Sequence, residues 1–218
     1  ITVRLVGSEM CIRDSLKTEE DQRKPCMFVL DSLGMLSTEK EIRDALDDKQ
    51  VRDMTKSQLV KGAFRMLTLK LGQANIPLIV TNHTYDVIGS YIPTKEMGGG
   101  SGLKYAASTI IYLSKAKEKE GTEVVGNIIK AKTAKSRLSK ENKEVKIRLY
   151  YDERGLDRYY GLLELGELGG LWKNVAGRYE IDGKKVYAKK ILASPEEYFT
   201  DEVMAKLEKI AGETFSYG

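Results

Sequence analysis

The chain contains few of the side chains that build disulfide or metal frameworks. Its 218 residues include one histidine, His83, and two cysteines, Cys11 and Cys26. Two cysteines are too few for a disulfide framework, so the sequence predicts a reducing compartment such as the cytoplasm. No cysteine lies at metal-ligand spacing from His83, which argues against a zinc site. No apolar run approaches the roughly eighteen residues that a membrane-spanning helix needs.

A phosphate-binding P-loop is also missing from the sequence. That motif requires Gly, four residues and then Gly-Lys-Ser/Thr. The glycine-rich stretch "EMGGGSGLKYAAS", residues 96–108, fails the pattern because Gly102 is followed by Leu103 and only then by Lys104. A flexible linker is a poor explanation too, because a strand-like run follows at once. The glycines therefore need another explanation.

Positive charge is concentrated in one part of the chain. The net charge is +4, which is too small by itself to indicate a nucleic-acid partner. Residues 115–148, however, contain eleven Lys and Arg against five Asp and Glu, so this stretch carries +6 and the remainder −2. The excess of positive charge identifies residues 115–148 as a basic segment, and its function has to be inferred from the motifs.

Apolar runs and their spacing predict an α/β fold. Residues 27–30 and 76–83 are predicted buried strands, and apolar side chains between residues 51 and 73 recur at helical spacing. A strand, a helix and a second strand in this order are typical of a mostly parallel sheet flanked by helices. Runs rich in β-branched residues predict further strands at residues 108–114, 123–134 and 144–152.

The character of the sequence changes near Tyr159. A short helix interrupted by glycines is followed by a predicted hairpin, with Asp182-Gly183 as its turn. A final helix is predicted over residues 194–215, with Ser194 as its N-cap and Pro195 in its first turn. Residues 159–218 are therefore predicted to form a small α+β domain.

The first fifteen residues show neither the pattern of the predicted α/β core nor that of the predicted C-terminal domain. They begin without Met, lack helical or strand periodicity, and lack the apolar core of a signal peptide. They resemble a translated sequencing adaptor, so residues 1–15 are predicted to be a non-native leader and are left out of the fold prediction. The core is then expected over residues 16–158, as the tail end of a longer protein.

Polar side chains close both predicted core strands. Asp31 and Ser32 follow the first strand, and Asn82 and His83 follow the second. Ligands bind at the carboxyl edge of open α/β sheets, where these groups would lie together. Asp31 there suits a Mg²⁺-bound water beside a nucleotide, and His83 suits a hydrogen bond to a terminal phosphate. An aspartate that only caps a turn and a purely structural histidine remain the alternatives.

The order of motifs resembles the RecA-type recombinases, and most of all the UvsX type of T-even phages. The resemblance covers residues from about 16 to the end and includes "FVLDSLGMLSTEKE", "IPLIVTNHTYD", "MGGGSGLKYAAS" and "YYGLLELG". It implies that residues 16–158 are the C-terminal half of a RecA-like ATPase core. It also implies that Asp31 closes the Walker B strand, with Ser32 beside the nucleotide, and that Asn82-His83 is a switch sensing the γ-phosphate.

The same resemblance gives the glycine-rich stretch a role in binding DNA. It implies a DNA-binding loop that includes Gly99, Gly100 and Ser101. Single-stranded DNA bound without sequence preference is held by its backbone, and glycines let the chain turn its N–H groups onto phosphates.

Basic residues are implied at two further places. Lys61 and Arg65 match family positions that touch the DNA backbone, with Arg52 and Lys56 as looser candidates; a solvated helix surface is the alternative. Lys135 and Arg137 match a basic pair that reaches the ATP of the neighbouring subunit in a filament, while Lys130 and Lys132 are expected to do no more than bind DNA. The alternative is a basic strand surface that binds DNA nonspecifically.

The resemblance implies ATP and Mg²⁺ as cofactors, with Asp31 meeting the metal through water. It implies single-stranded DNA, homologous duplex DNA and further copies of the protein in a helical filament as partners, together with mediator and single-strand-binding proteins. It implies no membrane partner, and the host cytoplasm if a phage encodes the protein. Because the P-loop and the water-activating acid are not in the sequence, the chain alone is not expected to hydrolyse ATP. A hexameric helicase of related fold and a non-catalytic DNA-binding paralogue remain rival interpretations.

Overall fold

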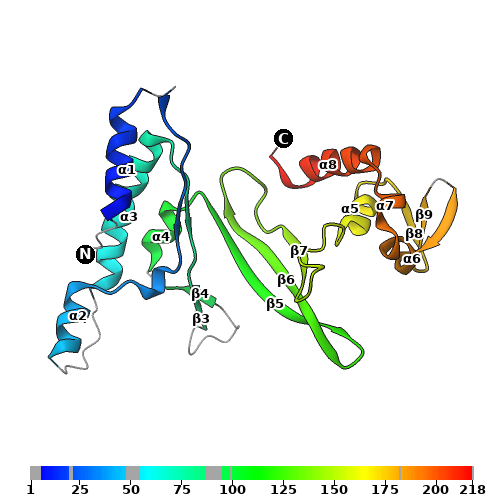
Figure 1. Ribbon diagram of the computed structural model, residues 1–218, viewed down its shortest axis with the longest axis horizontal. Coiled ribbons are helices and arrows are strands. Elements are labelled where there is room, and N and C mark those ends of the chain that lie inside the picture. Colours follow the sequence, from blue (N-terminus) through cyan, green and yellow to red (C-terminus); the bar gives the residue numbers. More distant parts are fainter. Residues whose placement is uncertain are drawn as a thin grey trace. The chain divides into compact units, whose positions relative to one another are not determined.

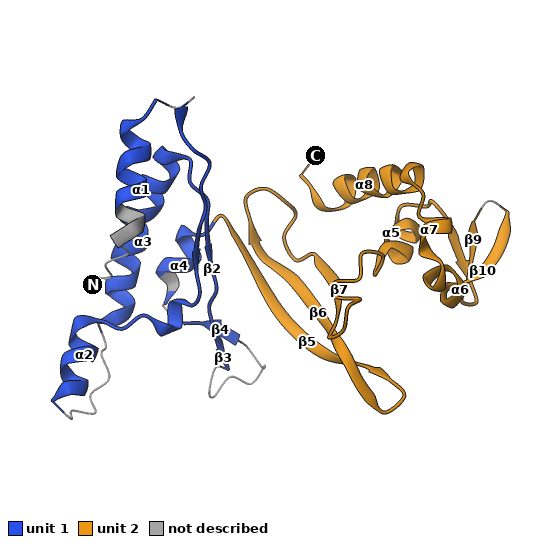
Figure 2. Ribbon diagram, viewed as in Figure 1, with its two compact units in different colours: residues 1–107 blue, residues 108–218 orange. Residues whose placement is uncertain are grey.

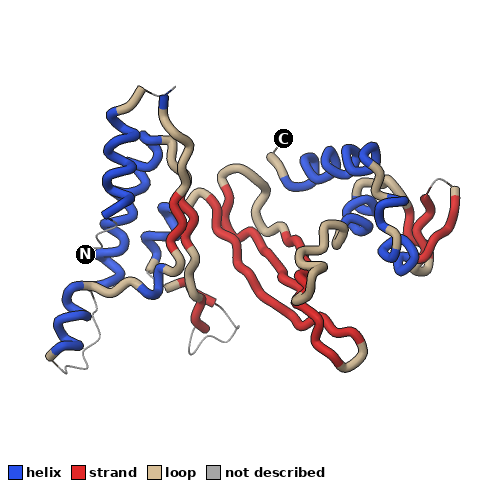
Figure 3. The backbone as a smooth tube through the Cα atoms, in the orientation of Figure 1, coloured by secondary structure: helices blue, strands red, loops and turns tan. Residues whose placement is uncertain are grey.

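The computed structural model describes residues 6–19, 22–47, 55–86, 95–98, 100–181 and 183–217, whose helices and strands are drawn in Figure 3. The chain divides into two compact units, residues 1–107 and residues 108–218 (Figure 2). The boundary expected after residue 158 falls inside unit 2. No described helix is both long and apolar enough to span a bilayer.

Unit 1 packs helices against a short parallel sheet. Along the chain it contains α1 (Val6–Lys17), β1 (Phe28–Leu30), the 3-10 turn η2 (Leu33–Met35), α2 (Glu39–Leu46), α3 (Lys56–Ala74), β2 (Leu78–Val80), β3 (Thr84–Asp86), β4 (Lys95–Met97) and α4 (Ser101–Ala106) (Figure 1). β1 and β2 pair in parallel, in register from Phe28↔Leu78 to Leu30↔Val80. β3 and β4 form an antiparallel pair.

Helix α3 supplies much of the core of unit 1. Its buried side chains, Val60, Phe64, Leu71 and Ala74, recur at helical spacing. The helix ends at Asn75, which adopts a left-handed conformation with φ 53°, two residues before Pro77. The predicted helix over residues 51–73 is therefore confirmed from Lys56 onward, and residues 51–54 lie outside the described residues.

The segment left out of the fold prediction is largely helical. Residues 6–15 belong to α1, and Ile12 is buried with Leu71 and Ala74 of α3 and with Ile76. Among residues 10–17, the part of α1 whose burial is described, Ile12 alone is buried, and one buried side chain produces no repeating apolar pattern for sequence periodicity to detect.

Unit 2 begins with an antiparallel sheet of three strands, β5 (Thr109–Glu120), β6 (Glu123–Ser136) and β7 (Glu144–Tyr150), in the order β5-β6-β7. The three strands were predicted, but a mostly parallel sheet is wrong for them. Only Gly121 and Thr122 connect β5 to β6, and parallel strands need a crossover of about a dozen residues or more. Among the described strands, parallel pairing is limited to β1 and β2, and the connection between them contains η2, α2 and α3.

The rest of unit 2 contains helices and a second antiparallel sheet. Its elements are α5 (Leu162–Leu168), β8 (Lys173–Val175), β9 (Arg178–Ile181), β10 (Lys184–Tyr187), α6 (Ala188–Ala193), α7 (Pro195–Tyr198) and α8 (Asp201–Phe215). The predicted hairpin is confirmed as the pair β9 and β10, while Asp182 of its predicted turn lies outside the described residues. The buried core of this part of unit 2 consists of Leu163, Trp172, Tyr179, Ile191, Phe199 and Leu207.

The predicted helix over residues 194–215 is wrong as a single element. The chain leaves the helical conformation at Phe199, whose side chain is buried in the core, and a new helix starts after Thr200. Thr200 Oγ1 accepts a hydrogen bond from the N–H of Val203 at 3.4 Å, so Thr200 caps the long helix α8. The side chain of Ser194 makes no capping hydrogen bond. The burial of Phe199 therefore overrides the local capping pattern at Ser194-Pro195.

Candidate nucleotide and DNA-binding site

The carboxyl ends of β1 and β2 meet, as the sequence predicts. The N–H of Thr81 donates to Leu30 O at 2.9 Å, and the N–H of Leu33 donates to Thr81 O at 3.0 Å. Thr81 Oγ1 donates to Asp31 Oδ1 at 2.5 Å, which fixes the Asp31 carboxylate across the strand ends. Sequence reasoning missed Thr81, although a hydroxyl directly after the second strand was the available signal. Ser32 follows Asp31 through a cis peptide bond, and its side chain makes no capping hydrogen bond.

The Asp31 carboxylate suits a contact with Mg²⁺ through water. It is exposed, and the hydroxyl of Thr81 engages one of its oxygens. No group of three or more His, Cys, Asp or Glu side chains within the described ranges is arranged to hold a metal. A single carboxylate fits a largely hydrated Mg²⁺, which commonly binds through one or two carboxylates and substrate phosphates.

Asn82 connects the strand end to the glycine-rich stretch. Its Nδ2 donates to Gly98 O at 2.7 Å, and its Oδ1 accepts from the N–H of His83 at 2.9 Å. The N–H of Gly98 in turn donates to His83 O at 3.1 Å. Both ends of the Asn82 amide thus hold the base of the β3–β4 hairpin, so any contact with a nucleotide would compete with these bonds.

The His83 ring lies beside the segment that follows Asp31. A methyl group placed on Gly34 of η2 would lie 3.4 Å from His83 Cδ2, which is ordinary van der Waals contact. The side chain is exposed. His83 therefore has the turn after β1 on one side and, through Asn82, the glycine-rich stretch on the other.

The glycine-rich stretch packs directly on α3. A Cβ on Gly102 would lie 2.5 Å from Lys61 Cγ and 2.9 Å from Lys61 Cα, so only glycine fits. Gly100 has φ 75°, and a Cβ there would lie 3.2 Å from the Cβ of Ser57. The two elements predicted to bind DNA, α3 and the loop entering α4, are thus in contact. Ser101 is the first residue of α4, whereas Gly99 and Arg52 lie outside the described residues.

The three basic candidates on α3 differ in their surroundings. Lys61 and Arg65 are exposed and four residues apart, so they lie on one face of the helix. Lys56 is half-buried, and its Nζ lies 3.1 Å from both carboxylate oxygens of Glu41. Glu41 also completes the capping box of α2 with Thr38. Lys56 is therefore engaged in an ion pair, whereas Lys61 and Arg65 form none within the part of the chain that the structure describes.

The basic pair of unit 2 lies at the end of β6. Lys135 pairs with Ile110, and Arg137 lies one residue beyond the strand, with its N–H donating to Ser108 O at 3.0 Å. The pairing register shifts between Ile110 and Ile111, which identifies a bulge. Because of the bulge, Lys135 faces the same side of the sheet as the earlier lysines of β6.

Two earlier lysines of β6, Lys130 and Lys132, are further candidates for the role toward the nucleotide, although the sequence predicts only DNA binding for them. Lys130, Lys132 and Lys135 are opposite Ser114, Tyr112 and Ile110, which alternate along β5, so all three lysines lie on one face. Lys130 and Lys132 are both exposed, and Lys130 Nζ forms an ion pair with Glu144 Oε2 at 2.9 Å. In a regular strand, Lys135 of "KAKTAK" would lie on the opposite face from Lys130 and Lys132. The bulge is what places all three lysines on one face.

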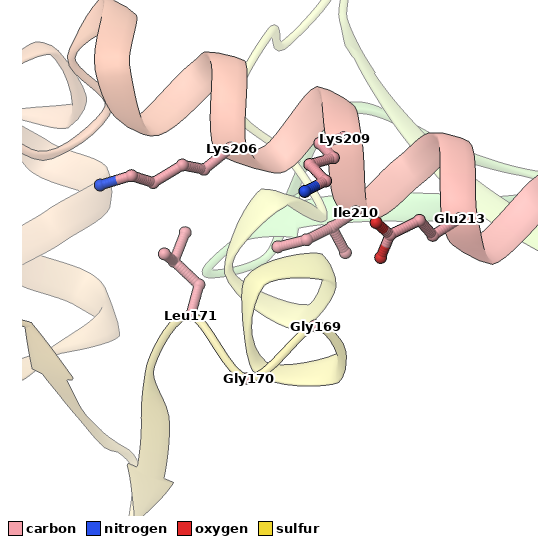
Figure 4. Close-up of a pocket in the computed structure, with 7 residues that line it drawn as sticks. All are labelled: Gly169, Gly170, Leu171, Lys206, Lys209, Ile210 and Glu213. Atoms are coloured by element: carbon pink, nitrogen blue, oxygen red, sulfur yellow. The ribbon is translucent and has the colours of Figure 1, made fainter.

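A shallow pocket in unit 2 contains none of the predicted site residues. It lies between the end of α5 and α8, and Figure 4 shows Leu171 and Ile210 with Lys206, Lys209 and Glu213 around Gly169 and Gly170. A Cβ on Gly169 would lie 2.5 Å from Ile210 Cδ1, so this glycine is needed for packing. The pocket is therefore a feature of the packing of α5 on α8.

Comparison with known proteins gives one consistent family. The family described as RecA N-terminal domain matches residues 23–157, more than half of the chain. The Recombination and repair protein of Enterobacteria phage T4 is 38% identical over 167 residues, which are 76% of this chain and 42% of that protein. Protein RecA of Chloroherpeton thalassium is 30% identical over 162 residues, 73% of this chain and 44% of that protein.

Protein RecA of an Arthrobacter species is 28% identical over 196 residues, 88% of this chain and 54% of that protein. The chain thus spans about half the length of the curated relatives that it matches. The family match and these relatives point to the same family. The chain belongs to the RecA-type recombinase family.

Proposed function

We propose that this chain is part of an ATP-dependent strand-exchange recombinase that binds single-stranded DNA as a helical filament. The observation that carries this proposal is the contact of Gly102 with Lys61, because it joins two separately predicted DNA-binding elements into one surface. Homologous duplex DNA is the second substrate, ATP and Mg²⁺ are the cofactors, and further copies of the protein are the filament partners. Mediator and single-strand-binding proteins would assist loading in the host cytoplasm.

The chemistry of the surface fits a backbone grip. Lys61 and Arg65 supply cationic side chains, and the glycine-rich stretch around Gly100 can present backbone N–H groups to phosphates. Neither group distinguishes one base from another. Binding without sequence preference, which strand exchange between arbitrary homologous sequences requires, follows from such a grip.

The ATP-side residues in unit 1 support coupling to this grip. Asp31 would meet Mg²⁺ through water, and His83 would donate a hydrogen bond to the terminal phosphate. A change at His83 would reach Gly98 through Asn82, whose amide bonds both residues. Since the P-loop is not part of the sequence, these residues would supply the metal and sensor side of an ATP site, and the chain alone is not expected to turn over ATP.

A hexameric helicase of related fold and a non-catalytic DNA-binding paralogue are the competing functions. Electron micrographs of a full-length recombinase carrying this sequence, formed on single-stranded DNA with ATP, distinguish these functions. We expect helical filaments. Closed rings would favour the helicase, and DNA binding that is indifferent to ATP would favour the paralogue.

Replacing Lys61 and Arg65 by alanine tests the DNA surface. We expect single-stranded DNA affinity to fall at least about tenfold at 0.1 M salt, and the slope of log K against log salt to flatten by about 1.4, because two phosphate contacts are lost. Fluorescence anisotropy on oligonucleotides of differing sequence measures both quantities, and the loss should be similar for all of them.

Lys70→Ala is the matched control, since Lys70 is an exposed lysine of α3 nine residues from Lys61, on the opposite side of the helix. It should leave affinity and salt slope nearly unchanged. If the double variant of Lys61 and Arg65 kept both its affinity and its slope, the DNA surface would have to be placed elsewhere.

Replacing His83 by alanine tests the switch. In a full-length recombinase carrying this sequence, ATP affinity should change little, because His83 would provide one of many phosphate contacts. ATP should no longer tighten DNA binding, because the connection from the phosphate to Asn82 and Gly98 starts at this ring. Anisotropy titrations with and without a slowly hydrolysed ATP analogue measure this coupling.

Thr84→Ala is the control for His83, because Thr84 is the exposed neighbour that begins β3 and pairs through its backbone. It should leave the effect of nucleotide intact. Full tightening of DNA binding by nucleotide in the His83 variant would show that the sensor is another residue.

A further inference from the structure

The loop that carries Arg137 is fastened at its inner side by Ser136. This side chain is 6% exposed, and its Oγ accepts from the N–H of Leu138 at 3.1 Å and from the N–H of Ser139 at 2.9 Å. The N–H of Ser136 donates to Glu141 Oε1 at 3.1 Å. Residues 136–142, here called the Ser136 loop, therefore have a defined conformation rather than an open connection between β6 and β7.

The outer side of the Ser136 loop is fastened to the last turn of α8. The N–H of Lys140 donates to Phe215 O at 2.8 Å, and Lys140 Nζ donates to Glu213 O at 2.8 Å. Ser139 and Ser216 form an antiparallel bridge. Figure 1 shows the end of α8 lying near the connection between β6 and β7, all within unit 2.

These contacts provide hydrogen-bond donors for carbonyl groups at the C-terminal end of α8. The last four carbonyls of a helix lack partners within the helix. In α8, Gly212 O accepts from the N–H of Ser216, and Lys140 satisfies both Glu213 O and Phe215 O. The ammonium group also opposes the negative end of the helix dipole. A residue 73 positions earlier in the chain thus caps α8.

We infer that Lys140 is a positioning residue that couples the C-terminal end of α8 to the loop carrying Arg137. Order in the last turn of α8 stabilises the conformation of the Ser136 loop, and the loop stabilises that turn in return, because a coupling free energy is reciprocal. Anything that binds or unwinds the end of α8 then changes how firmly Arg137 is held. The coupling itself needs no ATP; its purpose rests on the proposed role of Arg137 toward a neighbour's nucleotide.

Amide hydrogen exchange on the 218-residue chain tests the coupling. In Lys140→Ala, amides of residues 136–142 and 213–216 should exchange about fivefold faster, the effect of losing one hydrogen bond of ordinary strength. Lys140→Arg keeps a cationic donor and should restore most of the protection. Unchanged exchange in both segments of Lys140→Ala would overturn the inference.

Glu213→Gln is the matched control. Lys140 Nζ bonds the backbone carbonyl of Glu213 and not its carboxylate, so this variant should leave exchange in both segments unchanged. Acceleration equal to that of Lys140→Ala would mean that the carboxylate holds the loop, and the capping assignment would be wrong.

A second readout separates this inference from the proposed function. In a full-length recombinase carrying this sequence, Arg137→Ala should abolish most DNA-stimulated phosphate release, and Lys140→Ala should lower it severalfold. Unchanged release in Arg137→Ala would reject the role of Arg137 while leaving the exchange result of Lys140→Ala in place. Normal release in Lys140→Ala, despite faster exchange and a sensitive Arg137, would show that the coupling does not position Arg137.

Discussion

Replacing Lys135 and Arg137 together by alanine is expected to lower DNA-stimulated phosphate release by about 10³-fold or more in a full-length recombinase carrying this sequence. Cationic groups supplied by a neighbouring subunit stabilise the charge that develops on a transferred phosphoryl group. Lys135 lies at the end of β6 and Arg137 directly after it, in a loop whose conformation is fixed. Steady-state phosphate release with saturating single-stranded DNA measures the effect, and DNA affinity should change far less.

Lys130→Ala with Lys132→Ala is the informative companion variant. Both lysines lie on the same face of β6 as Lys135, so a merely basic surface would respond to either double substitution. We expect this companion to weaken DNA binding modestly and to retain phosphate release. If it abolished release while the Lys135 and Arg137 variant retained it, the role toward the nucleotide would belong to the other end of the lysine row.

Gly102→Ala is expected to destabilise unit 1 by about 2 kcal/mol and to weaken single-stranded DNA binding without removing any group that contacts DNA. The new methyl group would lie 2.6 Å from the Cβ and 2.9 Å from the Cα of Lys61, so the backbones of α3 and α4 must separate. Thermal unfolding followed by circular dichroism should show a midpoint roughly 8 °C lower. Anisotropy with single-stranded DNA measures the second effect.

Gly72→Ala is the control for the cost of the methyl group itself. Gly72 also lies in a helix, but a Cβ there would meet nothing within 4 Å. Alanine should therefore stabilise α3 by roughly 0.5–1 kcal/mol. An unchanged midpoint and normal DNA binding in Gly102→Ala would mean that α4 does not need its close approach to α3.

The strand ends and the main helix could be predicted because their signals are local. Apolar runs followed directly by polar residues placed Asp31 and Asn82 at one sheet edge, and helical periodicity found α3. Strand direction could not be predicted from the β-branched content of β5 and β6, since it depends on the length of the connection between them. A connection of two residues forces the antiparallel pair. The prediction of a mostly parallel sheet rested instead on the strand, helix and strand in the first half of the sequence, and it did not use the length of this connection.

Contacts between distant residues account for most of what the sequence concealed. The ion pair of Lys56 with Glu41 and the capping of α8 by Lys140 join residues far apart in the sequence, so neither follows from local spacing. The bulge near Ile110 changes which face of the sheet Lys135 occupies. The local sequence "TAK" does not predict a bulge. Asn82 has a residue type that suits a nucleotide contact, but its hydrogen bonds go to the protein backbone.

The outer edge of β5 has a consequence for how copies of the chain meet. β5 is a long edge strand of its three-stranded sheet, and it carries Lys115, Lys117 and Lys119 at alternating positions. An open strand edge can template the addition of a strand from another molecule, which is how many proteins begin to aggregate. Two β5 strands paired with Lys117 opposite Lys117 would bring ammonium groups opposite one another, which is unfavourable. The lysines therefore act as a safeguard of solubility, and this safeguard weakens as salt screens their charge.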